Sequence, residues 1–105
     1  MIIKIVKSKN LVPIRITDER WTHITENHPE VSDFFEYIIE CIEDPDYIIR
    51  SKKDENTLIA LRQFHNKFIC VVYKEITPED GFVVTAYFSK KINLNKENVI
   101  WQKHY

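Results

Sequence analysis

The spacing of the apolar residues switches from helical to alternating after Asp44-Pro45, which restricts the chain to folds with helices first and a sheet afterwards. Later segments are rich in β-branched and aromatic residues and are separated by polar turns. The expected elements are helices near 18–28 and 33–43, main strands at 47–50, 57–64, 68–76 and 82–89, and shorter strands at 2–6, 12–16 and 99–101. The sequence therefore predicts an α+β fold, with two N-terminal helices packed on one face of a four- to five-stranded antiparallel sheet.

The ends of the two helices carry local signals. Thr17 is a suitable N-cap for the first helix. Pro29 disfavours helical geometry at His28, where this helix is expected to end. Asp33 and Glu36 have the spacing of a capping box, which predicts that the second helix starts at 32 or 33.

The length and composition fit one domain spanning residues 1–105. The chain is 44% hydrophobic, which is enough to form a core without a disulfide or a metal. Its apolar runs are too short for a transmembrane helix, and lysines interrupt the N-terminal run, so we expect a cytoplasmic protein that does not contact a membrane. Cys41 and Cys70 match no redox or metal motif and are interpreted as buried thiols. No cofactor is expected.

The formal net charge of −1 conceals an uneven distribution along the chain. Residues 1–49 contain five Lys/Arg and ten Asp/Glu, whereas residues 50–105 contain ten and six. Either the basic half attracts phosphate, or the charges are ordinary scatter on a soluble surface. Charge alone does not decide the function.

The last two long strands are expected to form a hairpin that gathers hydroxyl groups on one face. A five-residue turn ending at Gly81, the only glycine, places Tyr73 opposite Thr85 and gives Gly81 a positive φ. Tyr87 and Ser89 then share the surface of Tyr73 and Thr85. The expected core face consists of Phe68, Cys70, Val72, Phe82, Val84, Ala86 and Phe88. Threonine and tyrosine are also good strand formers, so the gathering of hydroxyls has a purely structural alternative.

Arg62 is the main candidate for phosphate contact. It falls on the apolar face if the following turn has three residues, and on the hydroxyl face if the turn is longer or contains a β-bulge. Because an unpaired guanidinium in a core is costly, we favour the hydroxyl face, where it can bind two phosphate oxygens. Arg50 and Lys74 are secondary candidates, and Tyr73 and Ser89 complete the expected RNA- or phosphate-binding set.

His23 and His28 are candidates for proton transfer. They lie five residues apart, about 140° around a helix, and therefore do not form a two-histidine metal pair. No metal site is expected. A histidine that titrates near neutral pH is suited to activating a hydroxyl. The alternative is that each histidine only caps carbonyls at a helix end.

The ordered set of motifs resembles the phage-associated barnase–EndoU–colicin–RelE-like (BECR) nuclease domains, a toxin-like family. The matching segments are Ile16-Thr17-Asp18-Glu19-Arg20-Trp21-x-His23-Ile24, His28-Pro29-Glu30, Asp44-Pro45, Leu61-Arg62-x-Phe64, Val71-Val72-x-Lys74, Phe82-Val83-Val84-Thr85-Ala86-Tyr87-Phe88 and Val99-Ile100-Trp101. The resemblance runs from about residue 12 to residue 102.

The resemblance implies a metal-independent endoribonuclease, in which the ribose 2′-hydroxyl attacks the adjacent phosphate on an open sheet face. Carried over by position, His23 or His28 is the base or acid and Arg62 is the phosphate clamp. Thr85 and Tyr87 orient the substrate or donate protons. The implied partners are RNA and a small antitoxin protein. The alternatives are a non-catalytic RNA- or protein-binding relative and a small adaptor whose aromatic face binds another protein.

Overall fold

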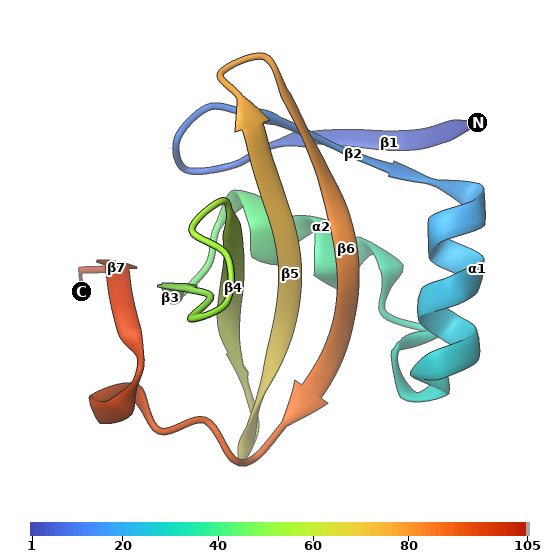
Figure 1. Cartoon of the computed structure of the whole chain (residues 1–105). Coiled ribbons are helices and arrows are strands. Elements are labelled where there is room, and N and C mark those ends of the chain that lie inside the picture. The colour runs from blue at the N-terminus through green and yellow to red at the C-terminus, as the bar shows by residue number, and fades with distance from the viewer. Residues whose placement is uncertain (105) are drawn as a thin grey trace.

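The computed structural model describes residues 1–104 and contains one curved sheet and two α-helices (Figure 1). The elements are β1 (Ile2–Lys7), β2 (Pro13–Thr17), α1 (Asp18–Asn27), η1 (Pro29–Val31), α2 (Phe35–Glu43), β3 (Tyr47–Arg50), β4 (Thr57–Phe64), β5 (Lys67–Thr77), β6 (Asp80–Ser89), η2 (Leu94–Lys96) and β7 (Asn98–Gln102). The described strands form a seven-stranded sheet in the order β1-β2-β6-β5-β4-β3-β7. All neighbours in it are antiparallel except β2 and β6.

The α+β class is as predicted, but the expected four- to five-stranded antiparallel sheet is wrong. The hairpin of β1 and β2 joins the sheet through a short parallel pairing with β6, where Ile14 faces Gly81 and Arg15 faces Phe82. At the opposite edge, β7 pairs with β3. Alternation of apolar residues predicts that such short segments are strands, but it does not identify the strand that each one joins.

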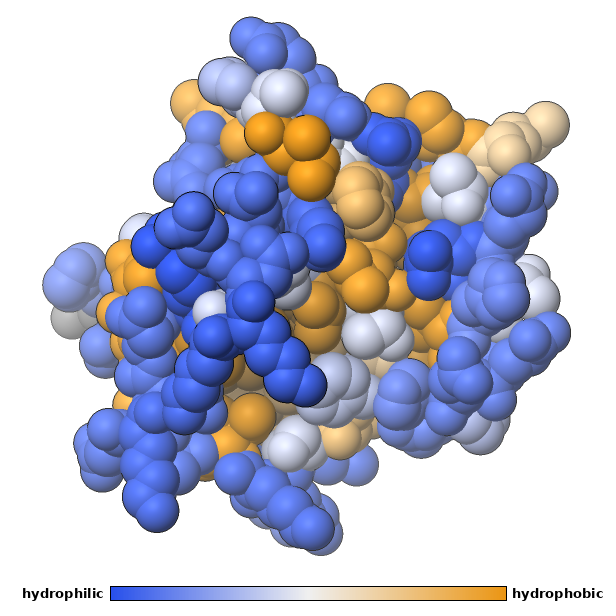
Figure 2. All heavy atoms as spheres, viewed as in Figure 1, coloured by the Kyte–Doolittle hydropathy of each residue, from blue (hydrophilic) through white to orange (hydrophobic). Residues whose placement is uncertain are grey.

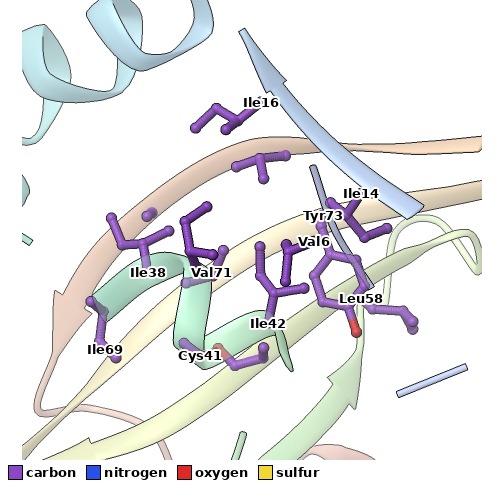
Figure 3. Packing of buried hydrophobic residues seen from close by; sticks show 14 of the residues in the cluster. Val6, Ile14, Ile16, Ile38, Cys41, Ile42, Leu58, Ile69, Val71 and Tyr73 are labelled. Atoms are coloured by element: carbon purple, nitrogen blue, oxygen red, sulfur yellow. Dashed lines mark hydrogen bonds between the residues drawn. The ribbon is translucent and has the colours of Figure 1, made fainter. Parts of the chain in front are cut away.

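The main core lies between the helices and one face of the sheet (Figure 3). The buried residues of α2 are Ile38, Ile39, Cys41 and Ile42. Ile24 of α1 belongs to the same cluster and is 1% exposed. The Trp21 ring of α1 meets Phe35 of α2 edge-on, with ring centroids 5.0 Å apart, and this contact joins the two helices. Both helices therefore pack on the same core, as expected.

The helix ends follow the sequence only in part. Thr17 caps α1 as predicted, because its side-chain oxygen accepts a hydrogen bond from the Arg20 N–H at 3.1 Å. The helix ends before Pro29, also as predicted. The capping box at 33 is wrong: the chain makes a 3-10 turn at Pro29–Val31, and α2 begins at Phe35 with Phe34 as its N-cap. The Phe34 N–H donates to the Val31 carbonyl at 2.9 Å, so Asp33 is held within this turn.

A second, smaller cluster lies on the opposite face of the sheet. Its buried members are Ile49, Leu61 and Cys70, and Ile92 and the first residue of η2, Leu94, pack against them. Cys41 belongs to the main core and Cys70 to this second cluster, and both thiols are free and buried, as predicted. No helix in residues 1–104 is long and apolar enough to cross a membrane.

Gly81 has a different role from the one expected. The β5–β6 turn is shorter than predicted, since Thr77 already pairs with Asp80, and Gly81 lies within β6 without a positive φ. A Cβ at this position would lie 2.5 Å from the Lys74 carbonyl oxygen and 2.6 Å from Ile14 Cδ1. Glycine is therefore required by the close approach of two strands.

Candidate functional site

The β5–β6 register decides which hydroxyl groups share a face. Val72 pairs with Thr85 and Cys70 pairs with Tyr87, whereas Tyr73 pairs with Val83. The register shifts between Val72 and Tyr73, which leaves an extra residue in β6 and keeps Thr85 and Tyr87 on one side. This side, opposite α2, is called the open face below. Its residues on β5 and β6 are Val72, Lys74, Phe82, Val84, Thr85, Tyr87 and Ser89.

The expected position of Tyr73 is wrong. Its side chain lies in the main core and is fully buried, and its hydroxyl has no hydrogen-bond partner within the described residues (Figure 3). In the observed register Thr85 faces Val72 and Tyr73 faces the buried Val83, so Tyr73 lies on the core face and not beside Thr85. Burial raises the pKa of the Tyr73 phenol. Tyr73 is therefore not a phosphate-binding residue.

The expected core face of β5 and β6 is correct only in part. Ala86 and Phe88 of β6 do belong to the main core or pack against it. The residues predicted as core that lie on the other side are Phe68, Cys70, Val72, Phe82 and Val84.

The expected position of Arg62 is also wrong. The β4–β5 turn has two residues, because Phe64 pairs with Lys67, and Arg62 pairs with the buried Ile69. The Arg62 side chain therefore leaves the sheet on the α2 side. There Nη1 lies 3.5 Å from Glu40 Oε2, and the guanidinium lies 5.1 Å from the centre of the Tyr37 ring. Arg62 is a structural residue, and the phosphate clamp does not exist in the predicted form.

His28 lies at the border of the open face. It ends α1, where its N–H donates to the Ile24 carbonyl at 2.7 Å, and its carbonyl accepts from the Val31 N–H at 3.1 Å. These two hydrogen bonds fix the backbone of His28, from which the imidazole extends. The ring lies beside Tyr87, with centroids 5.6 Å apart and planes inclined by 35°. Its Nδ1 is 3.4 Å from Glu30 Oε2.

Tyr87 presents a protonated phenol on the open face. It is half-buried against the second cluster, and this burial raises the pKa of its hydroxyl. Thr85 and Ser89 lie on either side of Tyr87 along β6, at the spacing of two residues that directs side chains to the same face. The structure thus brings together His28, Tyr87, Thr85 and Ser89 from the predicted set.

Two other candidates lie elsewhere. His23 is exposed on α1, and its side chain makes no hydrogen bond, ion pair or ring contact with another residue of 1–104. Arg50 is exposed at the end of β3 and pairs with Leu58, a residue of the main core, so its side chain leaves the sheet on the α2 side.

Lys74, a secondary candidate for phosphate contact, lies on the open face. It pairs with Phe82 in the ladder, and its Nζ is 3.0 Å from Asp54 Oδ2 in the β3–β4 loop. Hydrogen bonds from the Asn56 N–H and from Lys74 lower the pKa of the Asp54 carboxyl. The ion pair therefore persists at neutral pH.

Comparison with protein-family models, with curated proteins and with solved structures gives no match to this chain.

Sequence reasoning missed Arg15 and Arg20, which border the open face at the junction of β2, α1 and β6. Arg15 stands between the buried residues Ile14 and Ile16 of β2, so alternation could have placed it on the side opposite the core. Figure 2 views the molecule from the open side and shows hydrophobic residues in the middle of the face with hydrophilic residues around them.

The described residues contain no group of three or more His, Cys, Asp or Glu side chains arranged to hold a metal ion. The chemistry that this site offers is proton transfer between an imidazole and a phenol, with alcohol hydroxyls as hydrogen-bond donors. Aromatic and apolar side chains on the same face provide a surface on which a planar base can stack.

Proposed function

We propose that the chain is an endoribonuclease of the toxin-like BECR type that cleaves RNA by proton transfer and without a metal ion. The observation that carries the proposal is the His28 imidazole beside the Tyr87 phenol on the open face. An acid and a base within reach of one phosphodiester are the minimum that such a cleavage requires.

In the proposed reaction, His28 takes the proton of a ribose 2′-hydroxyl, whose oxygen then attacks the adjacent phosphorus. The P–O5′ bond breaks, and Tyr87 donates its proton to the departing 5′-oxygen. The products are a 2′,3′-cyclic phosphate and a 5′-hydroxyl, and a water molecule returns the proton from His28 to Tyr87. Because Nδ1 of His28 faces Glu30, Nε2 is the nitrogen available to the substrate.

The remaining residues of the open face have supporting roles. The hydroxyls of Thr85 and Ser89 donate hydrogen bonds to the non-bridging oxygens, where negative charge grows in the transition state. Lys74 attracts the RNA backbone farther along the same face. The Tyr87 phenol, whose ordinary pKa of 10.0 is raised by burial, carries the proton that this role requires at neutral pH.

We also propose that the enzyme acts as a cytoplasmic toxin that a small antitoxin protein holds inactive. Induction of the wild-type chain in a bacterial host is then expected to arrest growth, and His28→Ala is expected to relieve the arrest. Arrest by both proteins at equal expression would contradict a toxicity based on cleavage.

The decisive experiment is cleavage of an RNA oligonucleotide in EDTA, with analysis of the new ends. Wild-type protein is expected to yield 2′,3′-cyclic phosphate and 5′-hydroxyl ends. His28→Ala and Tyr87→Phe are each expected to lower kcat by about 100-fold or more, the usual contribution of a general acid or base. His23→Ala is the matched control, because it removes an exposed histidine of the same helix region.

Three results would contradict the proposal. Cleavage that disappears in EDTA and returns with one divalent ion would require a metal. Equal effects of His23→Ala and His28→Ala would remove the special role of His28. Binding of the RNA without any cleavage would instead support the non-catalytic RNA-binding alternative.

A further inference from the structure

A pocket opens where β2 and β6 separate. Their parallel pairing consists of only two residue pairs, Ile14 with Gly81 and Arg15 with Phe82, after which β2 leads into α1. The wedge between the diverging strands is a cavity of about 150 Å³. The residues that line it are Arg15, Thr17, Arg20, Phe82 and Val83.

Contacts with the protein hold one guanidinium of the pocket in place. Arg15 Nη1 donates to the Asp80 carboxylate and to the Gly81 carbonyl, the latter at 3.3 Å, and the guanidinium lies 5.5 Å from the centre of the Phe82 ring. These contacts orient the side chain and leave other N–H groups of its fork unused. Asp80 balances the charge of Arg15.

Arg20 supplies the second guanidinium and has no carboxylate partner within residues 1–104. Its Nη1 donates to the Val84 carbonyl at 3.5 Å, a long bond at an exposed position. Its backbone N–H donates to the Thr17 side chain, which fixes the first turn of α1 beside the pocket. Arg20 therefore remains able to bind an anion that enters the wedge.

The pocket combines the two features that recognise a nucleotide in single-stranded RNA. Arginine binds phosphate oxygens through paired N–H groups. An aromatic ring on the surface provides a platform for a base. Phe82 lines the pocket and is half-buried, so part of its side chain is exposed.

The pocket is too far from Tyr87 to take the nucleotide that reacts. Phe82 and Tyr87 are five residues apart on one strand, which corresponds to about 16 Å at the usual rise of about 3.3 Å per residue. A strand of RNA that reaches both places runs along β6 and past Thr85. This distance assigns the pocket to a neighbouring nucleotide of the same strand.

We propose that the pocket between β2 and β6 is a subsite for a flanking nucleotide of single-stranded RNA. Arg20 and the free N–H groups of Arg15 bind its phosphate, and its base stacks on Phe82. The assignment of RNA as the ligand rests on the proposed function. The subsite gives the enzyme a preference for longer substrates, because a dinucleotide cannot reach from Tyr87 to the wedge.

The first test measures binding of a five-nucleotide 2′-O-methyl RNA, which cannot be cleaved. Arg20→Ala is expected to weaken binding by about tenfold, the loss of one charged hydrogen-bond partner. Phe82→Leu, which keeps apolar volume but removes the ring, is expected to weaken binding to a similar degree. Arg50→Ala is the matched control, since it removes one exposed arginine on the α2 side of the sheet. Circular dichroism of each variant verifies the fold.

The second test compares kcat/KM for a five-nucleotide RNA with that for a dinucleotide. The ratio is expected to fall about tenfold in Arg20→Ala and to keep its wild-type value in Arg50→Ala. If Arg20→Ala and Arg50→Ala behave alike in both tests, the contribution is general charge and the subsite is overturned. A variant effect on the uncleavable RNA in a protein that cleaves nothing would support the subsite while overturning the proposed function. If the protein cleaves RNA but neither Arg20→Ala nor Phe82→Leu has an effect, the proposed function is supported and the subsite is overturned.

Discussion

The guanidinium of Arg62 and the carboxylate of Glu40 form an ion pair between β4 and α2, with Nη1 3.5 Å from Oε2. The Tyr37 ring lies against the same guanidinium, and the Tyr37 hydroxyl donates to the Gln63 carbonyl at 3.2 Å. Arg62 thus connects the sheet to the second helix on the side away from the open face. Its role is in packing.

We therefore expect Arg62→Ala and Arg62→Lys to leave the proposed RNA cleavage unchanged. The Glu40 carboxylate is 63% exposed, so the ion pair is screened, and loss of the arginine is expected to cost about 1 kcal/mol of unfolding free energy. Urea denaturation and the cleavage assay measure the two effects. A large loss of cleavage in a variant of unchanged stability would show that Arg62 belongs to the proposed active site after all.

Replacement of Tyr73 by phenylalanine is expected to stabilise the protein. The hydroxyl is fully buried without a partner in the described part of the chain, and such a group costs about 1–3 kcal/mol. The ring itself packs in the main core and is retained in Tyr73→Phe. The free energy of unfolding should therefore rise by about 1 kcal/mol, with cleavage unchanged. Reduced stability would show that the hydroxyl has a partner, such as a buried water.

Replacement of Gly81 by alanine is expected to destabilise the protein. The new methyl group would lie within 2.6 Å of both the Lys74 carbonyl oxygen and Ile14 Cδ1, so β2, β5 and β6 would have to separate. Overpacking of this kind costs about 1–3 kcal/mol. Urea denaturation measures the loss, and Ser89→Ala on the same strand serves as a control for substitution in β6. Unchanged stability of Gly81→Ala would mean that the strands separate easily.

The elements could be predicted from the sequence better than their register. Alternation and turn residues identify the strands, and 47–50 and 57–64 match the structure at both ends. The turn lengths were overestimated, because Pro78-Glu79 and His65-Asn66 each suffice to reverse the chain. Since side chains alternate with a period of two, an error of one residue exchanged Tyr73 and Val72 between the faces.

The sequence predicts the site residues correctly where their relative positions depend on a single strand. Thr85, Tyr87 and Ser89 share a face because they alternate on a single strand, and that pattern does not depend on the register. The prediction for Arg62 was wrong because the face on which this residue lies depends on how β4 pairs with β5. The contact of His28 with Tyr87 joins residues far apart in the sequence, and only the packing of α1 beside β6 brings them together.

The two buried thiols should make the protein less stable as the pH rises above 9. Burial raises the pKa of Cys70 from its ordinary value of 9.0 to about 12, and burial raises the pKa of Cys41 as well. Above pH 9 the unfolded chain loses these thiol protons while the folded chain keeps them. The unfolded state is then favoured increasingly, by up to about 1.4 kcal/mol per pH unit for each thiol. Below pH 9 the thiols are protonated in both states and contribute no pH dependence.

Urea denaturation between pH 7 and pH 10.5, in the presence of a reductant, tests this expectation. The contribution of the thiols to the free energy of unfolding of the wild type should be constant up to about pH 9 and should then fall. A Cys41→Ala/Cys70→Ala variant should be less stable at pH 7, because two buried side chains are shortened, but should fall less steeply above pH 9. The comparison of slopes separates the thiols from buried tyrosines such as Tyr73, whose raised pKa acts only above pH 10. Identical slopes between pH 9 and pH 10 in the two proteins would show that the thiols ionise equally in the folded and unfolded states.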